Sequence, residues 1–276
     1  MAYWDKLTGR GNVEDRRGQA AAIGGGLGAI GIVVTLIYSF LSGAPIDVAQ
    51  ILSQLQATQS TQQNLTNKDF EGADNYEVFA STVLGSTTDL WKNIFLQNSM
   101  TYPEPRLVLF RVATTSGCGM ATSDVGPHYC PSDQTIYIDE TFFVELQQRF
   151  KAKGGDVAEA YVIAHEVGHH VQNELGIMDQ IQQQGNSNEL SVKLELQADC
   201  FAGIWANSVN ELGVFQSGEI NEAIDAASAV GDDRIQQSTQ GQLSPETWTH
   251  GSSQQRVEWF TKGFDSGDPQ TCNTFS

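Results

Sequence analysis

The chain has 276 residues and a formal net charge of −18. Its length allows one sizeable globular domain plus an appendage. The acidic balance argues against nucleic-acid binding, because a phosphate backbone needs a basic surface, and four cysteines without a C-x-x-C pair argue against a thioredoxin-like redox site.

An apolar segment near the N-terminus is long enough to cross a membrane. From Ala20 to Leu41 the sequence carries no charge and would span about 33 Å as a helix. Basic residues precede this run but do not follow it closely, so the positive-inside rule predicts a cytoplasmic tail over residues 1–19. We therefore predict a single-pass protein of the cell inner membrane, with a transmembrane helix over 20–42 and a periplasmic or extracellular C-terminal domain. A cleaved signal peptide is the alternative, but the apolar run is longer than such peptides have, and Pro45 would follow the cut.

Residues 43–75 are rich in Gln, Ser, Thr and Asn, which is typical of a linker. From about Tyr76 the composition becomes that of a globular protein, and we expect one domain over residues 76–276. It begins with two strand-like segments. "RLVLFRV" (106–112) is a short apolar run, and "QTIYID" (134–139) has the period-2 alternation of a half-buried strand.

The remainder of the domain has the spacing and capping signals of helices. Asp156 followed by Glu159 is a capping-box pattern, and Gly176 lies just past the far end of the same helix. Asn186 followed by Glu189 repeats the pattern for a second helix. Because helices dominate and strands are few, we predict an α+β fold, mainly helical with a small sheet. Further helices are expected over residues 140–150, 218–229 and 252–264, the last of them capped by Ser252 and Gln255.

The segment "AHEVGHHVQNELG" (164–176) has the arrangement of a zinc-binding helix. His165 and His169 are one helical turn apart, so both imidazoles project from the same face and can reach one zinc ion. Glu166 is turned about 100° around the helix and reaches a metal-bound water more naturally than the metal. This is the H-E-x-x-H pattern, in which the glutamate acts as general base. His170 points off this face, and we expect a packing or surface role for it.

A zinc site of this kind needs a third protein ligand and an open position for water. The metzincin pattern would place a further glycine and histidine on the same run, but Gln172 and Leu175 occupy those positions. His128 and His250 remain possible third ligands, as do many carboxylates.

The best candidate is Glu195, in "ELQADCFAG" (195–203) on the next helix. Packing of that helix against the histidine helix would bring Glu195 to the metal. Asp199, one turn further, could then accept a hydrogen bond from the back nitrogen of a zinc-bound histidine, which fixes the tautomer of that ligand. The predicted ligand set is His165, His169 and Glu195, with water in the fourth position.

The four cysteines suit an oxidising exterior. Cys118 with Cys130 would close a glycine-rich loop, and Cys200 with Cys272 would attach the C-terminal tail to the helix of "ELQADCFAG". Four cysteines allow three pairings, so this choice rests on proximity alone. A zinc site built from Cys118, His128 and Cys130 is an alternative, although it lacks the usual ligand spacing.

Several segments together resemble the bacterial "putative neutral zinc metallopeptidase" family of single-span membrane proteins. The likeness covers most of the chain, and the two-histidine motif followed by E-x-x-x-D is similar to that of the gluzincin peptidases. It implies a zincin-like fold, Zn2+ and peptidase activity. It also implies that His165, His169 and Glu195 are ligands and that Glu166 is catalytic. The segments are "NVEDRRG" before the apolar run, "AHEVGHHVQ", "ELQADCFAGIWA", "GDDRIQ" and "THGSSQQR".

The resulting prediction is a membrane-anchored zinc endopeptidase that acts on peptides or unfolded proteins. Glu166 takes a proton from the zinc-activated water and passes it to the leaving amine. His250 is the first candidate for a donor to the oxyanion, with Tyr161 and Tyr137 as further ones. The strand over 134–139 is the natural edge along which an extended substrate could add.

Two other functions use the same features. A catalytically silent zincin fold could serve as a periplasmic binding scaffold, although the presence of Glu166 argues against it, because a scaffold needs no general base. A zinc hydrolase of non-peptide amides would use the same water-activating chemistry as a peptidase.

Overall fold

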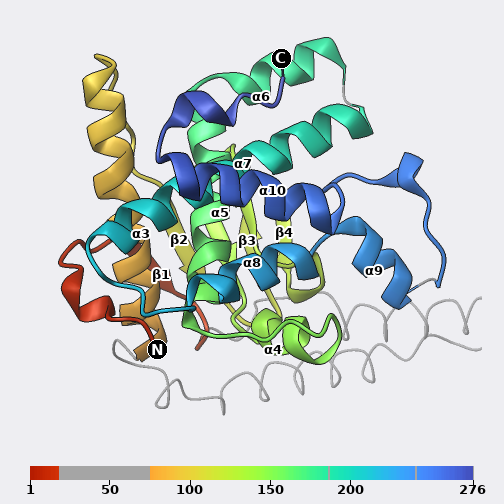
Figure 1. The fold of residues 1–276 in the computed structure, drawn as a ribbon, viewed down its shortest axis with the longest axis horizontal. Helices are drawn as coiled ribbons and strands as arrows, with labels where there is room; N and C mark the ends of the chain where they lie inside the picture. The colour runs from red at the N-terminus through yellow and green to blue at the C-terminus, as the bar shows by residue number, and fades with distance from the viewer. Residues whose placement is uncertain (19–74, 186, 240, 276) are drawn as a thin grey trace, which may run out of the picture.

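The computed structural model describes residues 1–18, 75–185, 187–239 and 241–275 (Figure 1). The expected transmembrane helix over 20–42 and most of the expected linker lie outside these ranges. Within them, no helix is both long and apolar enough to span a bilayer. The described residues form a small mixed sheet, a two-stranded hairpin and a larger set of helices, so the predicted α+β fold with mainly helical content is confirmed.

The strands are short and belong to two sheets. The larger sheet has the order β1–β2–β6–β5, in which β1, β2 and β6 are parallel and β5 is antiparallel to β6. β3 and β4 form a separate antiparallel hairpin. The strand bounds are β1 (Asn12–Asp15), β2 (Arg106–Leu109), β3 (Ala113–Ser116), β4 (Gly119–Thr122), β5 (His128–Cys130) and β6 (Thr135–Ile138).

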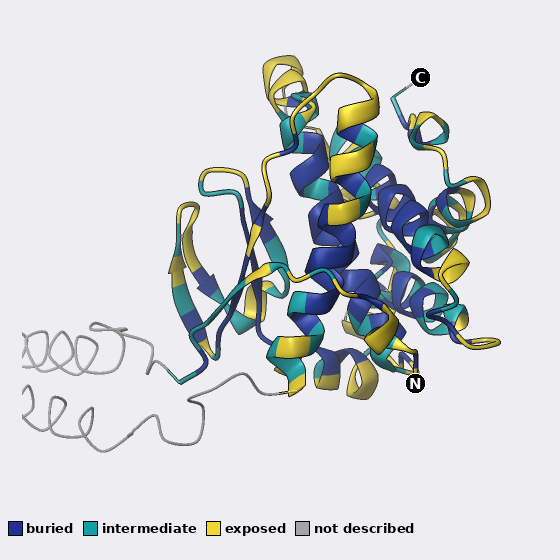
Figure 2. Cartoon of the chain, turned by 90° about the vertical axis from the view of Figure 1, so that its left-hand side faces the viewer, coloured by how far each residue is buried: buried dark blue, intermediate teal, exposed yellow. Residues whose placement is uncertain are grey.

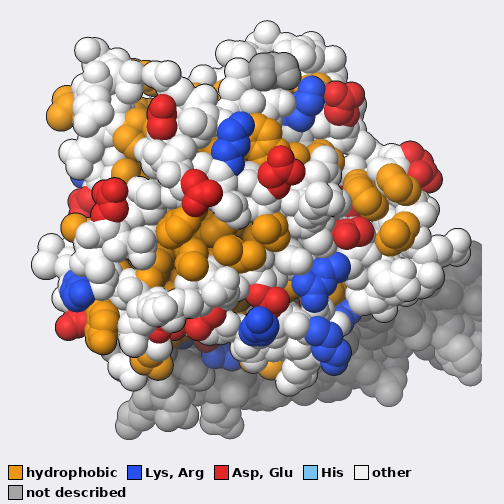
Figure 3. Space-filling model, viewed as in Figure 1, with side chains coloured by type: hydrophobic (Ala, Val, Ile, Leu, Met, Phe, Trp, Pro, Cys, Tyr) orange, Lys and Arg blue, Asp and Glu red, His pale blue; other side chains and the backbone are white. Residues whose placement is uncertain are grey.

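The helices surround one long helix, α5, which contacts α3, α7 and α8 as well as β5 and β6. Buried residues gather in this central part of the molecule (Figure 2). On the face shown in Figure 3, acidic and basic side chains are interspersed. The α-helices are α3 (Asn75–Gln97), α4 (Thr141–Gln148), α5 (Asp156–Glu174), α6 (Ile177–Gln184), α7 (Asn188–Glu211), α8 (Ile220–Ala229), α9 (Asp232–Thr239) and α10 (Ser253–Ser266). The 3-10 helices are η1 (Trp4–Lys6), η3 (Ser123–Val125), η4 (Pro245–Thr247) and η5 (Pro269–Cys272).

Both faces of the larger sheet are covered, which explains why its central strands are apolar throughout. In β2, Leu107 and Leu109 belong to the core shared with the helices, while Val108 packs with Tyr137 of β6 and with the hairpin β3–β4. The prediction of a half-buried strand over 134–139 is therefore wrong, because Tyr137 is only 2% exposed. The physical reason is that the glycine-rich segment expected to be a loop folds as β3–β4 and covers the second face.

β5, rather than β6, is the edge strand next to α5, which corrects the edge predicted from the sequence. In addition to its pairing with β6, β5 is held in place by a disulfide and by a side-chain hydrogen bond. Cys130 forms a disulfide with Cys118 in the turn of the hairpin, and the Tyr129 hydroxyl donates to Nδ1 of His170 at 2.9 Å. His170 donates from Nε2 to the Pro103 carbonyl at 2.8 Å, and burial lowers its pKa. The packing role expected for this histidine is confirmed: it ties α5 to the sheet.

The second disulfide joins Cys200 of α7 to Cys272 of η5. Both predicted pairings are thus confirmed, and the alternative zinc site at Cys118 and Cys130 is wrong because both sulfurs are in a disulfide. α7 also packs very closely on α10, since a Cβ on Gly263 would lie 2.0 Å from the carbonyl oxygen of Cys200.

Of the three predicted helix caps, one is confirmed, one is displaced and one is wrong. Ser252 and Gln255 form the capping box of α10. The N-cap of α7 is Ser187, one residue later than predicted. α5 begins after Gly155, and Asp156 does not cap it, because the Asp156 carboxylate instead accepts hydrogen bonds from the N-terminal segment.

The N-terminal segment is part of the globular domain. β1 pairs in parallel with β2, and the indole Nε1 of Trp4 donates to Asp156 at 2.7 Å. The Trp4 ring packs edge-to-face on Phe79 and Phe215. These contacts correct the prediction of a separate tail over residues 1–19. The four-residue strand "NVED" is too short and too polar to show the alternation that would have identified it.

The ladder between β1 and β2 also limits the membrane topology. Paired strands lie about 4.8 Å apart, whereas the hydrocarbon core of a bilayer is about 30 Å thick. β1 and β2 are therefore too close together for a bilayer to lie between them. The two flanks of segment 19–74 also meet, because the Arg17 guanidinium lies 5.9 Å from the centre of the Tyr76 ring.

We expect Trp4→Ala to lower the free energy of unfolding by about 2 kcal/mol, because it removes a partly buried indole packed on two other rings. Tyr3→Ala is the matched control: Tyr3 is 48% exposed, and its loss should cost no more than about 0.5 kcal/mol. Urea denaturation of both variants, followed by far-UV circular dichroism, measures the difference. Equal stability of the two variants would contradict a structural role for the N-terminal segment.

Candidate metal centre

A close crossing of α5 and α7 positions the site. At the crossing, Gly168 of α5 faces Ala198 of α7, and a Cβ on the glycine would lie 3.0 Å from both the Cα and the carbonyl oxygen of Ala198. A larger residue would push the helices apart, so the glycine sets their separation. His165 and His169, on either side of this glycine along α5, therefore come within reach of Glu195 on α7.

Three side chains converge on one point. Nε2 of His165 lies 3.2 Å from one carboxylate oxygen of Glu195, and Nε2 of His169 lies 3.4 Å from the other. One possible ligand atom from each residue lies within 4.8 Å of the other two. In the described part of the chain this is the one such group of His, Cys, Asp or Glu side chains, and neither His128 nor His250 belongs to it.

Asp199 lies behind His165. Its fully buried carboxylate lies 2.9 Å from Nδ1 of His165 and accepts a hydrogen bond from the Tyr161 hydroxyl at 2.5 Å. Arg256 of α10 donates to both oxygens, from Nε at 2.8 Å and from Nη2 at 2.9 Å. Burial raises the pKa of Asp199, but the charges of Arg256 and His165 outweigh burial and lower the pKa overall. An ionised Asp199 holds the proton of neutral His165 on Nδ1 and leaves Nε2 available to a metal.

His169 has an uncharged partner instead. Its Nδ1 lies 2.9 Å from Oε1 of Gln172, three residues later on the same helix. The amide nitrogen of Gln172 donates to the main-chain carbonyl of Leu194 at 2.7 Å, so the amide oxygen faces the imidazole. His169 therefore carries its proton on Nδ1, and both histidines present Nε2 to the same point.

Protons compete with a metal for these ligands. Burial lowers the pKa of His165, but Asp199 and Glu195 outweigh burial and raise the pKa to about 10. The pKa of His169 is raised in the same way, against burial, by Glu195. Burial raises the pKa of Glu195, but the two imidazoles hold it well below its usual value. A divalent cation thus displaces protons when it binds here, and its affinity falls as the pH falls.

Glu166 lines an open cleft in front of this centre. The cleft has a volume of about 560 Å³, and the Glu166 residue is 6% exposed. The same cleft is lined by His165 and His169, by residues 125–129 at the start of β5, and by His250. A molecule in the cleft can therefore contact the histidine pair, the glutamate and the edge strand together.

The candidates for an oxyanion donor differ in their surroundings. His250 lines the cleft with a half-exposed ring, and its Nδ1 lies 3.1 Å from Asp232. Tyr161 also lines the cleft, but its hydroxyl already donates to Asp199. Tyr137 packs against the hairpin on the other face of the sheet, so it is the wrong residue for this role.

Sequence analysis missed three residues that support the site: Arg256, Gln172 and Asp232. A signal for the first was present, because Arg256 lies in line with Phe260 and Gly263 on the buried face of α10. A charge on such a face requires a buried partner of opposite sign. Gln172 is three residues from His169 on the same helix, so its spacing was also a signal, whereas Asp232 meets His250 only through the tertiary fold.

Comparison with known proteins defines the class to which this fold and site belong. The family described as "Putative neutral zinc metallopeptidase" matches residues 2–275, nearly the whole chain. The chain therefore belongs to this family, whose name suggests a zinc-dependent peptidase. The resemblance inferred from the sequence segments is confirmed.

Two relatives show how far the likeness extends. "Uncharacterized protein YpfJ" of Escherichia coli (strain K12) is 42% identical over 290 aligned positions, which cover 99% of this chain and 98% of that protein. "Uncharacterized protein Rv2575" of Mycobacterium tuberculosis (strain H37Rv) is 50% identical over 187 positions, which cover 63% of this chain and 64% of that protein. No solved structure gives a significant match.

Removal of the Arg256 charge should be strongly destabilising. Arg256→Met leaves the Asp199 carboxylate buried without its cation, and we expect the free energy of unfolding to fall by about 3–5 kcal/mol. Arg149→Met is the control, because Arg149 forms an exposed pair with Glu145 that is worth at most about 1 kcal/mol. Adding Asp199→Asn to Arg256→Met should recover part of the loss in thermal denaturation. If the losses of unfolding free energy from Arg256→Met and Asp199→Asn simply added in the double variant, the proposed pairing of Arg256 with Asp199 would be contradicted.

Proposed function

We propose that this chain is a zinc peptidase that hydrolyses peptide bonds with Glu166 as the general base. One observation carries the proposal: two imidazoles and a carboxylate converge beside an open cleft that Glu166 also lines. Membership of a family named for zinc metallopeptidases supports it independently of the geometry.

The donor set suits zinc, and we propose His165, His169 and Glu195 as its ligands. Two imidazole nitrogens and one carboxylate oxygen are a usual ligand set of catalytic zinc, which keeps one further position for water. Bound zinc supplies Lewis acidity, which activates water and polarises a carbonyl group. Asp199 and Gln172 support the assignment because they orient both Nε2 atoms toward the same point.

The role proposed for Glu166 is proton transfer. Its position next to His165 on α5 and its place in the cleft put it beside the ligands rather than among them. From there the carboxylate can accept a proton from the attacking water and deliver it to the leaving amine. Its low exposure keeps competing bulk water away from this exchange.

We propose His250 as the donor that stabilises the developing oxyanion. The Asp232 carboxylate contacts the ring Nδ1 and accepts from the main-chain N–H of His250 at 2.7 Å. This anchor fixes the ring, and in the imidazolium form Nδ1 donates to Asp232 while the second N–H, on Nε2, can donate to a substrate oxygen.

The substrate class that the cleft supports best is an extended peptide. β5 ends the described sheet, so its outer edge offers main-chain groups to which a peptide can add as a further strand. The first residues of β5 line the same cleft as Glu166. An unfolded segment lying along β5 would thus pass in front of the proposed zinc ligands, which favours peptides over small non-peptide amides.

Glu166→Gln should abolish cleavage of unfolded proteins while zinc stays bound, because the amide cannot accept a proton. We expect a fall in kcat of at least about 100-fold. Zinc content by atomic absorption and cleavage of a denatured protein give the two readouts. Equal turnover in both forms would defeat the peptidase proposal, and so would zinc-loaded wild type that cleaves nothing, which would favour a binding scaffold.

Glu195→Ala should lose zinc, because it removes one of three proposed ligands. Glu189→Ala is the matched control on the same helix, since the Glu189 side chain is 78% exposed and forms an ion pair with Lys193 at the surface. Far-UV circular dichroism should show that both variants keep their helices. Full zinc retention in Glu195→Ala would mean that another group supplies the third ligand.

His250→Ala should lower kcat by about 100- to 1,000-fold with little change in zinc content, because it removes one donor to the oxyanion. Glu246→Ala, an exposed residue four positions earlier, is the control and should keep near-normal turnover. A similar kcat in wild type and His250→Ala would assign the oxyanion donor elsewhere.

We propose that the domain works outside the cytoplasm and that residues 20–42 attach it to the inner membrane. Two disulfides support an oxidising compartment, and the β1–β2 ladder supports a topology in which residues 1–18 share that compartment. The apolar segment would then enter the membrane from the side on which both of its flanks lie.

Labelling of single introduced cysteines tests this topology. Tyr3→Cys and Leu243→Cys place exposed thiols on the N-terminal segment and on the main part of the domain. A thiol reagent that cannot cross membranes should label both in intact cells after the outer membrane is permeabilised. Labelling of Leu243→Cys alone would contradict this topology and would favour the cytoplasmic N-terminus predicted from the sequence.

A further inference from the structure

We infer that Gln172 and Gln197 form a positioning chain that links His169 to the Cys200–Cys272 disulfide, so that the zinc affinity of the site and the redox state of this disulfide are coupled. The inference rests on the proposed zinc site but does not require that the protein cleaves peptides.

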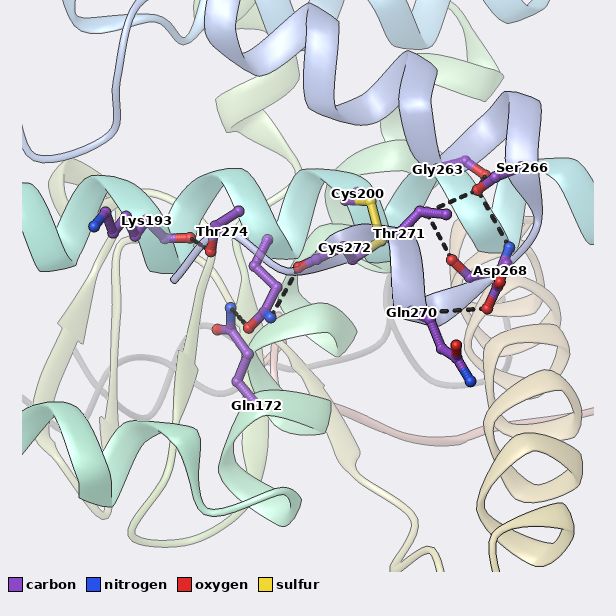
Figure 4. Close-up of a disulfide and its surroundings, with 11 residues drawn as sticks. Gln172, Lys193, Cys200, Gly263, Ser266, Asp268, Gln270, Thr271, Cys272 and Thr274 are labelled. Carbon is purple, nitrogen blue, oxygen red and sulfur yellow. Dashed lines mark hydrogen bonds between the residues drawn. A yellow bond between two sulfur atoms is a disulfide. The ribbon is translucent and has the colours of Figure 1, made fainter. Parts of the chain in front are cut away.

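The chain consists of consecutive hydrogen bonds through the protein interior, and Figure 4 shows the part of it from Gln172 to Cys272. Nδ1 of His169 lies 2.9 Å from Oε1 of Gln172. Nε2 of Gln172 donates to Oε1 of Gln197 at 3.1 Å, and Nε2 of Gln197 donates to the main-chain carbonyl of Cys272 at 3.0 Å. Both glutamine side chains are buried, so water does not readily replace a lost partner.

Two main-chain carbonyls fix the direction of this chain. A carbonyl oxygen only accepts, so the amide nitrogen of Gln197 must face Cys272 and that of Gln172 must face Leu194. The amide oxygens then point the other way, and Oε1 of Gln172 can only accept from His169. The imidazole proton is thereby held on Nδ1, and the Nε2 lone pair is directed toward Glu195.

The disulfide holds the far end of the chain in place. Cys200 lies on α7 three residues after Gln197, and its bond to Cys272 fixes η5 against that helix. A second bond, from the Thr274 hydroxyl to the Lys193 carbonyl at 2.8 Å, lies two residues beyond Cys272 and near the end of the chain. Without the disulfide, the Cys272 carbonyl depends on this contact, on a 2.9 Å hydrogen bond between the Thr271 and Ser266 hydroxyls, and on packing.

The other zinc histidine does not use this chain. His165 is oriented by Asp199, which Arg256 holds from α10. The other disulfide, Cys118–Cys130, joins the hairpin to β5 and contacts neither glutamine. It is therefore a control for effects of disulfide loss that do not pass through His169.

Reduction by a dithiol breaks the Cys200–Cys272 bond. Two electrons and two protons pass from the dithiol to the two sulfurs, and the dithiol closes to its own disulfide. The freed tail releases the Cys272 carbonyl from Gln197, Gln172 loses its fixed direction, and His169 binds zinc less well. Loss of such outer support lowers metal affinity by about 10- to 100-fold.

Thermodynamic reciprocity gives the converse effect. If reduction weakens zinc binding by a given factor, zinc opposes reduction by the same factor. For a two-electron couple each factor of ten is about 30 mV. Saturating zinc should therefore lower the reduction potential of Cys200–Cys272 by about 30–60 mV and leave that of Cys118–Cys130 unchanged.

Zinc affinity of the full-length protein in detergent, measured by competition with a chelator, is the first test. The double variant Cys200→Ala, Cys272→Ala should bind zinc about 10- to 100-fold more weakly than wild type. The double variant Cys118→Ala, Cys130→Ala should bind it normally. Gln172→Met and Gln197→Met keep both disulfides and should also weaken binding, so the inference does not depend on folding of a cysteine variant.

The second test measures both disulfides in one wild-type molecule. The protein is equilibrated in dithiol buffers with and without free zinc set by a chelator, then alkylated and analysed by mass spectrometry. A zinc-dependent shift confined to Cys200–Cys272 supports the inference. No shift, an equal shift of both disulfides, or normal zinc affinity in Gln197→Met overturns it. Zinc coupling without any peptide cleavage supports this inference and overturns only the proposed function.

Discussion

The approach of two helix backbones at Gly168 is the constraint on which the site depends. Because α5 and α7 nearly touch there, the histidines of one helix and Glu195 of the other share a space a few ångströms across. One helical turn brings the two histidines together, but local structure alone could not place Glu195 beside them. The rigid crossing of two long helices supplies the precise placement that a metal site requires.

The polar groups around this crossing compensate one another. Asp199 faces Arg256, His165 lies between two carboxylates, and the neutral Gln172 orients His169. An isolated buried charge would cost several kcal/mol, and pairing offsets that cost. The contacts that orient these side chains are therefore the same ones that join α5, α7 and α10, and the geometry of the site cannot be altered without altering the core.

Local spacing explains what could be predicted from the sequence. His165, Glu166 and His169 follow from helical periodicity, and Glu195 follows if the next helix packs on the first. The remaining features depend on partners that are distant along the chain. "NVED" is a strand only because β2 lies beside it, and the glycine-rich segment is a hairpin only because a sheet face needs covering. The pattern of α10 indicates that Arg256 is buried, but it does not identify Asp199 of α7 as its partner.

Because β1 pairs with β2, non-covalent contacts as well as the covalent chain hold residues 1–18 to the rest of the fold. A protease that cut between residues 18 and 75 would produce two fragments, yet the paired strands and the Trp4 contacts would keep them associated. Such nicked protein would separate into two pieces only on denaturation, like a complex of complementing fragments.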